Sequence, residues 1–92
     1  MVTGAMPALP TARDDVLLRR VGSEWILFDA RQDRAHVLNL AAALVWTYCD
    51  GAHAPDDMAE AIAREIADAR EEAIRADIES VLRRFADEGL LR

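Results

Sequence analysis

The segment HVLNLAAALVWTYCDG, residues 36–51, is the most hydrophobic part of the chain and decides how the rest is arranged. Its first residues resemble a short strand, and the side chain of Asn39 can cap the first turn of a helix. Residues 40–49 are apolar on nearly every side, which predicts a helix buried among other elements. Gly51 supplies the left-handed residue at which such a helix commonly ends. The segment therefore predicts a strand followed at once by a buried helix.

Two further strands are predicted before this segment. Residues 16–21 (VLLRRV) and 24–29 (EWILFD) are rich in β-branched and aromatic side chains, and the dipeptide Gly22-Ser23 separates them as in a tight hairpin. Residues 24–29 are apolar on both faces, so we expect this strand to be central and covered on both sides. After a polar turn at 30–34, a third strand over 35–38 completes an antiparallel meander.

Two more helices are predicted after the buried one. Pro55 suits the first position of a helix, and Asp68 with Glu71 resembles the capping box of another, which Gly89 would end. The predicted core positions of these helices are Met58, Ile62, Ile66, Ile74, Ile78, Val81 and Phe85. The fold class is therefore α+β: a three-stranded antiparallel sheet followed by a three-helix bundle, similar to a winged helix.

Length and composition indicate one small domain. The chain has 92 residues, and we expect residues 1–13 to form a flexible arm and residues 14–92 the folded domain. The start of the chain lacks the basic and apolar regions of a signal peptide, and no stretch approaches the length of a membrane span. A single cysteine, Cys49, cannot form an internal disulfide. These features predict a cytoplasmic protein that does not contact a membrane.

The charge distribution disfavours nucleic acid as a partner. Residues 1–38 contain five Arg and five acidic residues, whereas residues 39–92 contain six Arg and twelve acidic residues. The chain has no Lys, and its net charge is −6. A protein that binds nucleic acid needs a basic surface to replace the counterions of the phosphates. The predicted helices carry the opposite sign.

The sequence offers no recognisable catalytic, cofactor or metal site. His36, His53 and Cys49 do not have the spacing of zinc ligands. Cys49 has no adjacent base that would make it a nucleophile, and paired carboxylates such as Asp56-Asp57 are explained by the start of a helix. We therefore expect a protein that is not an enzyme, with no catalytic residues, no metal and no cofactor.

The order of several short elements resembles the PqqD-like proteins. The shared pattern is a strand ending in Leu-Asn, small residues, an apolar-Trp pair, Asp-Gly, and a closing helix followed by Gly-Leu-Leu. In this chain these elements are Leu38-Asn39, Ala41 to Ala43, Val45-Trp46, Asp50-Gly51 and Gly89-Leu90-Leu91. The match extends over about residues 13–92.

This resemblance implies a peptide chaperone, a recognition element for ribosomally made and modified peptides. Such a domain holds the leader segment of a precursor peptide and presents it to a modifying enzyme, such as a radical SAM protein. The leader would add to the third strand as an extra strand, with side chains against the third helix. The expected peptide-binding residues are Ala35, His36, Val37, Leu38, Arg75, Ile78, Leu82 and Ala86. Asp77, Arg84 and Glu88, on the other shoulder of that helix, are expected to lie outside the site.

Two alternatives remain open from the sequence. A winged-helix regulator that binds DNA would have a similar order of elements. A structural module could instead form a homodimer through its edge strands or through the apolar shoulder of the third helix.

Overall fold

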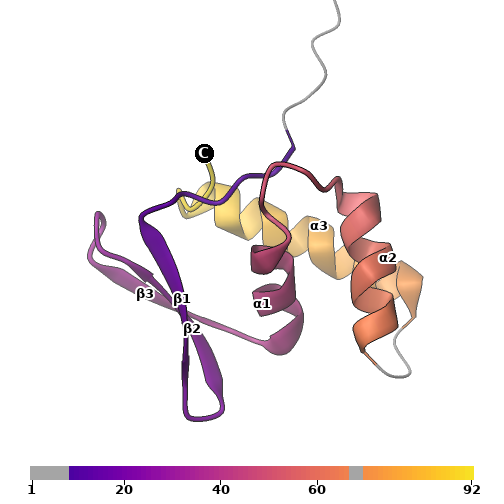
Figure 1. The fold of residues 1–92 in the computed structure, drawn as a ribbon, viewed down its shortest axis with the longest axis horizontal. Helices are drawn as coiled ribbons and strands as arrows, with labels where there is room; N and C mark the ends of the chain where they lie inside the picture. The colour runs from indigo at the N-terminus through magenta and orange to yellow at the C-terminus, as the bar shows by residue number, and fades with distance from the viewer. Residues whose placement is uncertain (1–8, 67–69) are drawn as a thin grey trace, which may run out of the picture.

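The structure is a computed structural model that describes residues 9–66 and 70–92. Its elements, in chain order, are β1 (Val16–Val21), β2 (Glu24–Asp29), β3 (Arg34–Leu38), α1 (Leu40–Thr47), α2 (Pro55–Glu65) and α3 (Glu71–Asp87) (Figure 1). This order confirms the predicted α+β architecture of an antiparallel sheet followed by three helices. None of the helices in the described part of the chain is long and apolar enough to cross a membrane.

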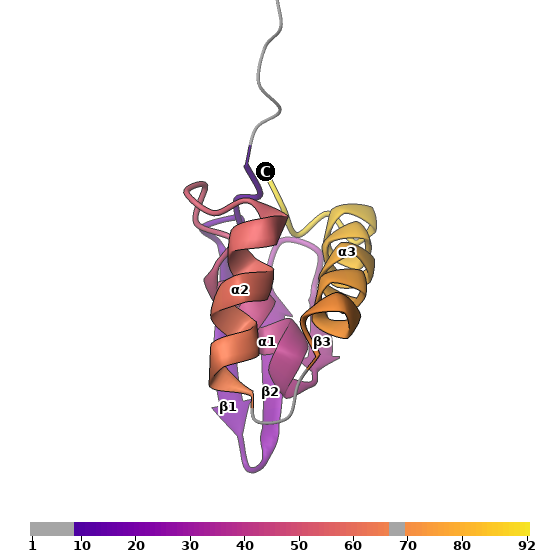
Figure 2. The same ribbon diagram turned by 90° about the vertical axis from the view of Figure 1, so that its right-hand side faces the viewer.

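The sheet is an antiparallel meander in the order β1-β2-β3, so β2 is central and β3 is an edge, as predicted. Its inner face, which includes Leu27 and Leu38, is buried, and the helices stand in front of this face (Figure 2). On the outer face, Phe28 and Val37 are 41% and 55% exposed. The prediction that β2 is covered on both faces was therefore wrong, because all three helices lie on one side of the sheet.

The helix α1 connects the sheet to the other two helices. The side chain of Asn39 accepts a hydrogen bond from the backbone N–H of Ala42 over 2.8 Å, which confirms the predicted cap. The helix ends at Thr47, two residues earlier than predicted. Trp46 is buried and meets Phe85 of α3 edge to face, with ring centroids 5.4 Å apart. This pair joins the first and last helices in the core, as the pattern of apolar residues predicts.

The ends of the other helices agree in part with the prediction. The helix α2 begins at Pro55, and the Asp57 carboxylate accepts a hydrogen bond from the Ala54 backbone N–H over 3.1 Å. Asp68, the expected cap of α3, lies outside the described residues, and the helix begins at Glu71. Gly89 follows α3 with a φ of 71°, the left-handed conformation expected where this helix ends.

Residues just before β1 belong to the domain. Thr11 forms an isolated β-bridge with Asp50, and Ala12 forms one with Leu91 near the end of the chain. Arg13 is buried. The predicted arm over 1–13 is therefore too long at its C-terminal end, because residues 11–13 pair with two segments far away in the sequence. Residues 1–8 of that arm lie outside the described residues.

Candidate functional site

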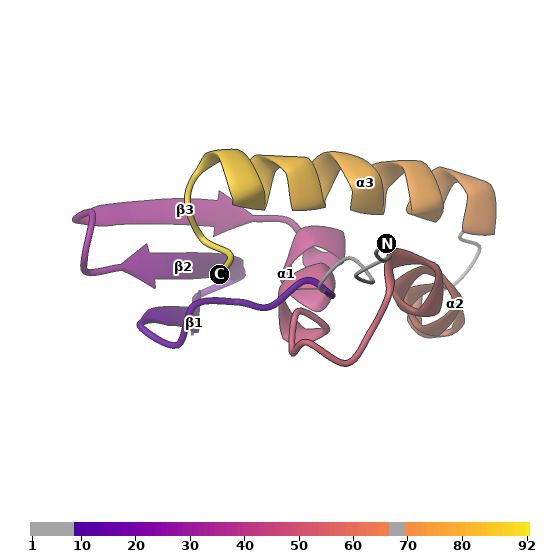
Figure 3. The same cartoon turned by 90° about the horizontal axis from the view of Figure 1, so that it is seen from above.

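The candidate site is the free edge of β3 together with the side of α3 that faces it (Figure 3). The two elements are connected by long polar side chains. A guanidinium N–H of Arg84 donates to the backbone carbonyl of Val37 over 3.4 Å. One turn further along, at the residue that follows the end of α3, the Glu88 carboxylate lies 3.4 Å from a guanidinium nitrogen of Arg34. These contacts fix which face of α3 is turned towards the strand.

The contact from Arg84 also identifies the backbone groups at the edge. Residue pairs in an antiparallel ladder alternate between those that exchange hydrogen bonds and those that do not. The Val37 carbonyl points towards α3 and not towards β2. Val37 and Ile26 are therefore a pair that exchanges no backbone hydrogen bonds. Ala35, two residues away, likewise exchanges no backbone hydrogen bonds with its partner Phe28. His36, between them, exchanges its backbone hydrogen bonds with Leu27 of β2. Ala35 and Val37 therefore present their N–H and C=O groups to an incoming strand.

His36 lies on the inner face of β3 and is 8% exposed. Its Nδ1 atom is 4.0 Å from a carboxylate oxygen of Glu88. Its Nε2 atom is buried and has no hydrogen-bond partner among the described residues. A buried polar atom without a partner is costly, so His36 is a position at which a bound group could add a hydrogen bond.

A small apolar pocket lies between the helices. Its lining comes from α1, α2 and α3 and comprises Ala41, Val45, Ile62, Ile74, Asp77, Ile78 and Val81. Ile78, one of the residues expected to bind peptide, is in this lining, whereas Leu38 at the end of β3 is buried in the core. One residue of the pocket lining, Ala41, follows the last residue of the edge strand, Leu38, by three positions in the chain.

The predicted orientation of α3 was reversed. A guanidinium nitrogen of Arg75 is 3.2 Å from the Asp56 carboxylate, so this shoulder faces α2. Leu82 is seven residues further along, nearly two full turns, and therefore lies on the same shoulder, where it packs against the core. Arg84 and Glu88, which we expected to lie away from the strand, instead reach β3. The sequence could not decide this, because both shoulders of α3 contain arginine.

Ala86 lies on the Arg75 shoulder as well and is exposed. The expected set of binding residues is therefore divided by the structure. Ala35, His36, Val37 and Leu38 belong to β3, and Ile78 lines the pocket. Arg75, Leu82 and Ala86 are on the side of α3 that does not face this strand. Whether any of these residues binds a peptide stays a prediction.

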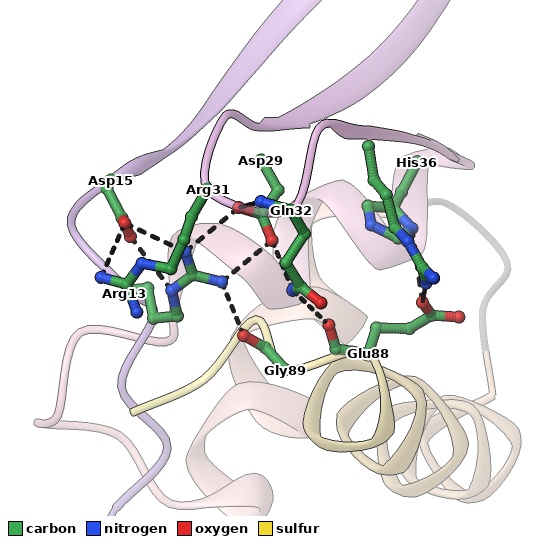
Figure 4. A network of polar contacts seen from close by, with 9 residues as sticks. Arg13, Asp15, Asp29, Arg31, Gln32, His36, Glu88 and Gly89 are labelled. Carbon is green, nitrogen blue, oxygen red and sulfur yellow. Dashed lines mark hydrogen bonds and ion pairs between the residues drawn. The ribbon is translucent and has the colours of Figure 1, made fainter.

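A buried ion pair holds the strand end of the site in place (Figure 4). The guanidinium of Arg13 donates to both carboxylate oxygens of Asp29, over 2.9 and 3.1 Å, and to the backbone carbonyl of Gly89 over 2.8 Å. The Gln32 side-chain amide donates to Asp29 over 2.7 Å and to the Glu88 carbonyl over 3.0 Å. The β2–β3 turn is therefore attached to the end of α3.

The same contacts control the ionisation of Asp29. Hydrogen bonds from Arg13, with further ones from Gln32, lower the pKa of the Asp29 carboxyl to about 2, although its burial acts in the opposite direction. Asp29 is therefore charged at neutral pH, and its charge is neutralised inside the protein by Arg13. The sequence shows both residues but gives no sign that residues sixteen positions apart form a pair.

The surroundings of Cys49 and His53 do not resemble those of catalytic residues or metal ligands. Cys49 is buried, and burial together with the neighbouring Asp50 raises the pKa of its thiol to about 12. A thiol with such a pKa is protonated at neutral pH and is a poor nucleophile. The Nδ1 atom of His53 lies 2.9 Å from the Asp50 carboxylate. Within residues 9–66 and 70–92, no three His, Cys, Asp or Glu side chains are placed to hold a metal ion.

Two solved structures have a similar fold. One is described as TbiB1 in complex with the TbiA(beta) leader peptide; it has a TM-score of 0.72 and 20% identity and covers 89% of this chain and 94% of its own. The other, a lasso peptide synthetase B1 complexed with the leader peptide, has a TM-score of 0.73 and 21% identity, with coverages of 88% and 94%. Comparison with curated proteins found no match. The family model described as Coenzyme PQQ synthesis protein D (PqqD) matches residues 24–91, and the chain therefore belongs to the PqqD family.

Proposed function

We propose that this chain is a non-catalytic peptide-binding chaperone. It captures the leader segment of a ribosomally made precursor peptide as a fourth strand on β3 and presents the peptide to a modifying enzyme. The observation that carries the proposal is the free edge of β3, where Ala35 and Val37 direct their backbone groups outward beside α3. An edge strand next to a helix is the geometry used in β-strand addition.

The descriptions of the structural neighbours support the same function, whereas the apolar pocket does so only if it opens. Strand addition gives affinity through backbone hydrogen bonds, and pockets for alternate side chains give specificity. The pocket lined by Val45, Ile78 and Val81 has a volume of about 10 Å³, which is too small for a side chain, so these residues would have to move apart before a peptide side chain could enter. The two structural neighbours are described as complexes with leader peptides, which supports the choice of a leader segment as the ligand.

The proposal can be tested with a displayed library of random peptides, because the natural precursor is not needed for this purpose. Peptides selected on the wild-type domain are synthesised with a fluorophore, and their affinities are measured by fluorescence polarisation. Val37→Pro removes one outward N–H group at an edge position, where proline is tolerated. We expect it to weaken binding on the order of tenfold, because one backbone hydrogen bond is lost and a peptide carbonyl is left unpaired.

Val37→Ala is the matched control, because it shortens the same side chain and keeps the N–H group. Its affinity should stay near that of the wild type. His36→Pro should instead destabilise the sheet, because its N–H group is directed towards β2. If every selected peptide binds Val37→Pro and Val37→Ala equally well, the peptides bind elsewhere and strand addition to β3 is wrong.

Three finer points of the function remain proposals. The modifying enzyme is expected to be a radical SAM protein. This expectation would be contradicted if the genes for this chain and a precursor lay beside a gene for another class of modifying enzyme. The proposed binding of a leader peptide would not be affected. A cytoplasmic location agrees with the unpaired thiol of Cys49. Sedimentation equilibrium over a range of concentrations distinguishes a monomer from a homodimer, which was the structural alternative.

A further inference from the structure

The arginine of α3 that reaches β3 occupies a group that an incoming strand needs. The Val37 carbonyl accepts a hydrogen bond from Arg84, and it is also one of the outward acceptors of the edge. A carbonyl oxygen can accept two hydrogen bonds, but the guanidinium lies where the added strand would lie. A peptide that pairs with Val37 must therefore displace Arg84 or provide it with another partner.

We propose that Arg84 is a specificity-determining residue that selects a peptide with a carboxylate at one position of the bound strand. This inference rests on the proposed function. In the free domain Arg84 covers the Val37 carbonyl. In the complex it moves to an Asp or Glu side chain of the peptide, where a charge-assisted hydrogen bond replaces the neutral one.

The register follows from the alternation of side chains along a strand. The side chains of Ala35 and Val37 point to the exposed outer face, whereas those of His36 and Leu38 point to the inner face. Peptide residues opposite the second pair therefore point towards α3. The peptide residue nearest Arg84 is the one that should carry the carboxylate, and its neighbour two residues away, towards the pocket, should be apolar.

The charges on this side of α3 restrict the acidic residue to one place. Asp77 precedes Arg84 by nearly two turns, and Glu88 follows it by about one turn. Both side chains are acidic and repel a peptide carboxylate, although the charge of Glu88 is partly offset by its ion pair with Arg34. The whole chain has a net charge of −6, so an acidic peptide gains no general attraction. Within Glu71–Asp87, Arg84 is therefore the side chain on this shoulder that favours an acidic peptide residue, while Arg34 of β3 already pairs with Glu88.

The test uses the same displayed library on three folded domains: the wild type, Arg84→Glu and Arg83→Glu. Arg83 is the matched control because it is exposed and about 100° around the helix from Arg84. We expect peptides selected on the wild type and on Arg83→Glu to contain Asp or Glu at one position, two residues from an apolar residue. Peptides selected on Arg84→Glu should contain Lys or Arg there.

A double-mutant cycle then measures the pair. A selected peptide with Glu at this position and its Gln analogue are titrated against the wild type and Arg84→Gln. The Glu peptide should bind Arg84→Gln about five- to tenfold more weakly, with a smaller effect at high salt, while the Gln peptide should change less than twofold or bind more tightly. Equal losses for both peptides, or no acidic preference on the wild type, would overturn the role of Arg84. If strand addition itself is wrong, the peptides will also ignore Val37→Pro, so the two failures can be told apart.

Discussion

Trp46 is the residue whose removal should affect the stability of the domain most. It is 7% exposed, and its ring meets Phe85 at an interplanar angle of 88°. Burial of a ring this large removes on the order of 200 Å² from water, equivalent to about 5 kcal/mol at 25 cal/mol per Å². Truncation of buried Trp to Ala costs about 3–5 kcal/mol in measured series. We expect a loss in this range for Trp46→Ala.

The size of the domain makes such a loss decisive. A chain of 92 residues should have a free energy of unfolding of about 5–14 kcal/mol. Urea unfolding followed by circular dichroism should show a midpoint lowered by about 3–5 M, since the slope for so small a domain is near 1 kcal/mol per M. Trp25→Ala is the matched control, because Trp25 is only partly buried and stacks under Arg20. A midpoint for Trp46→Ala that is no lower than that of Trp25→Ala would refute the assignment of Trp46 to the core.

Two other predictions concern the polar groups of the structure. The pKa of Asp29 is about 2, below its ordinary value of 3.8, so its ion pair with Arg13 should contribute stability above pH 4 that is lost as the pH falls towards 2. Asp29→Asn should lower the melting temperature at pH 7 and flatten its decrease between pH 4 and 2, whereas Asp14→Asn, at an exposed carboxylate, should leave that decrease in place. Cys49, with a pKa of about 12, should react with a disulfide reagent at pH 8 far more slowly in the native protein than in urea, and rapid labelling of the native protein would contradict its burial.

The predicted fold was largely correct because its signals are local. The strands over 16–21 and 24–29 have the same bounds in the sequence pattern and in the structure, and Gly22 has the positive φ of a tight turn. The cap at Asn39 also depends on neighbouring residues alone. What the pattern could not predict was which side of the sheet the helices leave open. Both faces of 24–29 are apolar, and only the packing of three helices on one side shows that Phe28 is left exposed.

The candidate site was also predictable only in part: the edge of β3 could be predicted from the sequence, whereas the orientation of α3 could not. The edge position of β3 follows from the order of the strands, which the sequence predicts, so the segment Ala35 to Leu38 could be predicted as the docking edge. Which of its backbone groups face outward is shown only by the contact between Arg84 and Val37. The direction of α3 does not follow from its own sequence, because a helix with Arg75 on one shoulder and Arg84 on the other can be placed either way. The contacts Arg75–Asp56 and Arg34–Glu88 decide between the two placements, and each joins residues far apart in the chain.

The reversal of α3 changes what the site can recognise. With Leu82 beside β3, the helix would offer an apolar wall, and the specificity of the peptide would depend on its hydrophobic residues. With Arg84 beside β3, the helix offers a charge that already interacts with the edge and must find a new partner when a strand is added. Recognition then depends on the place of one acidic residue relative to one apolar residue. Substitution of Arg84 therefore distinguishes the two placements by the peptides that are selected.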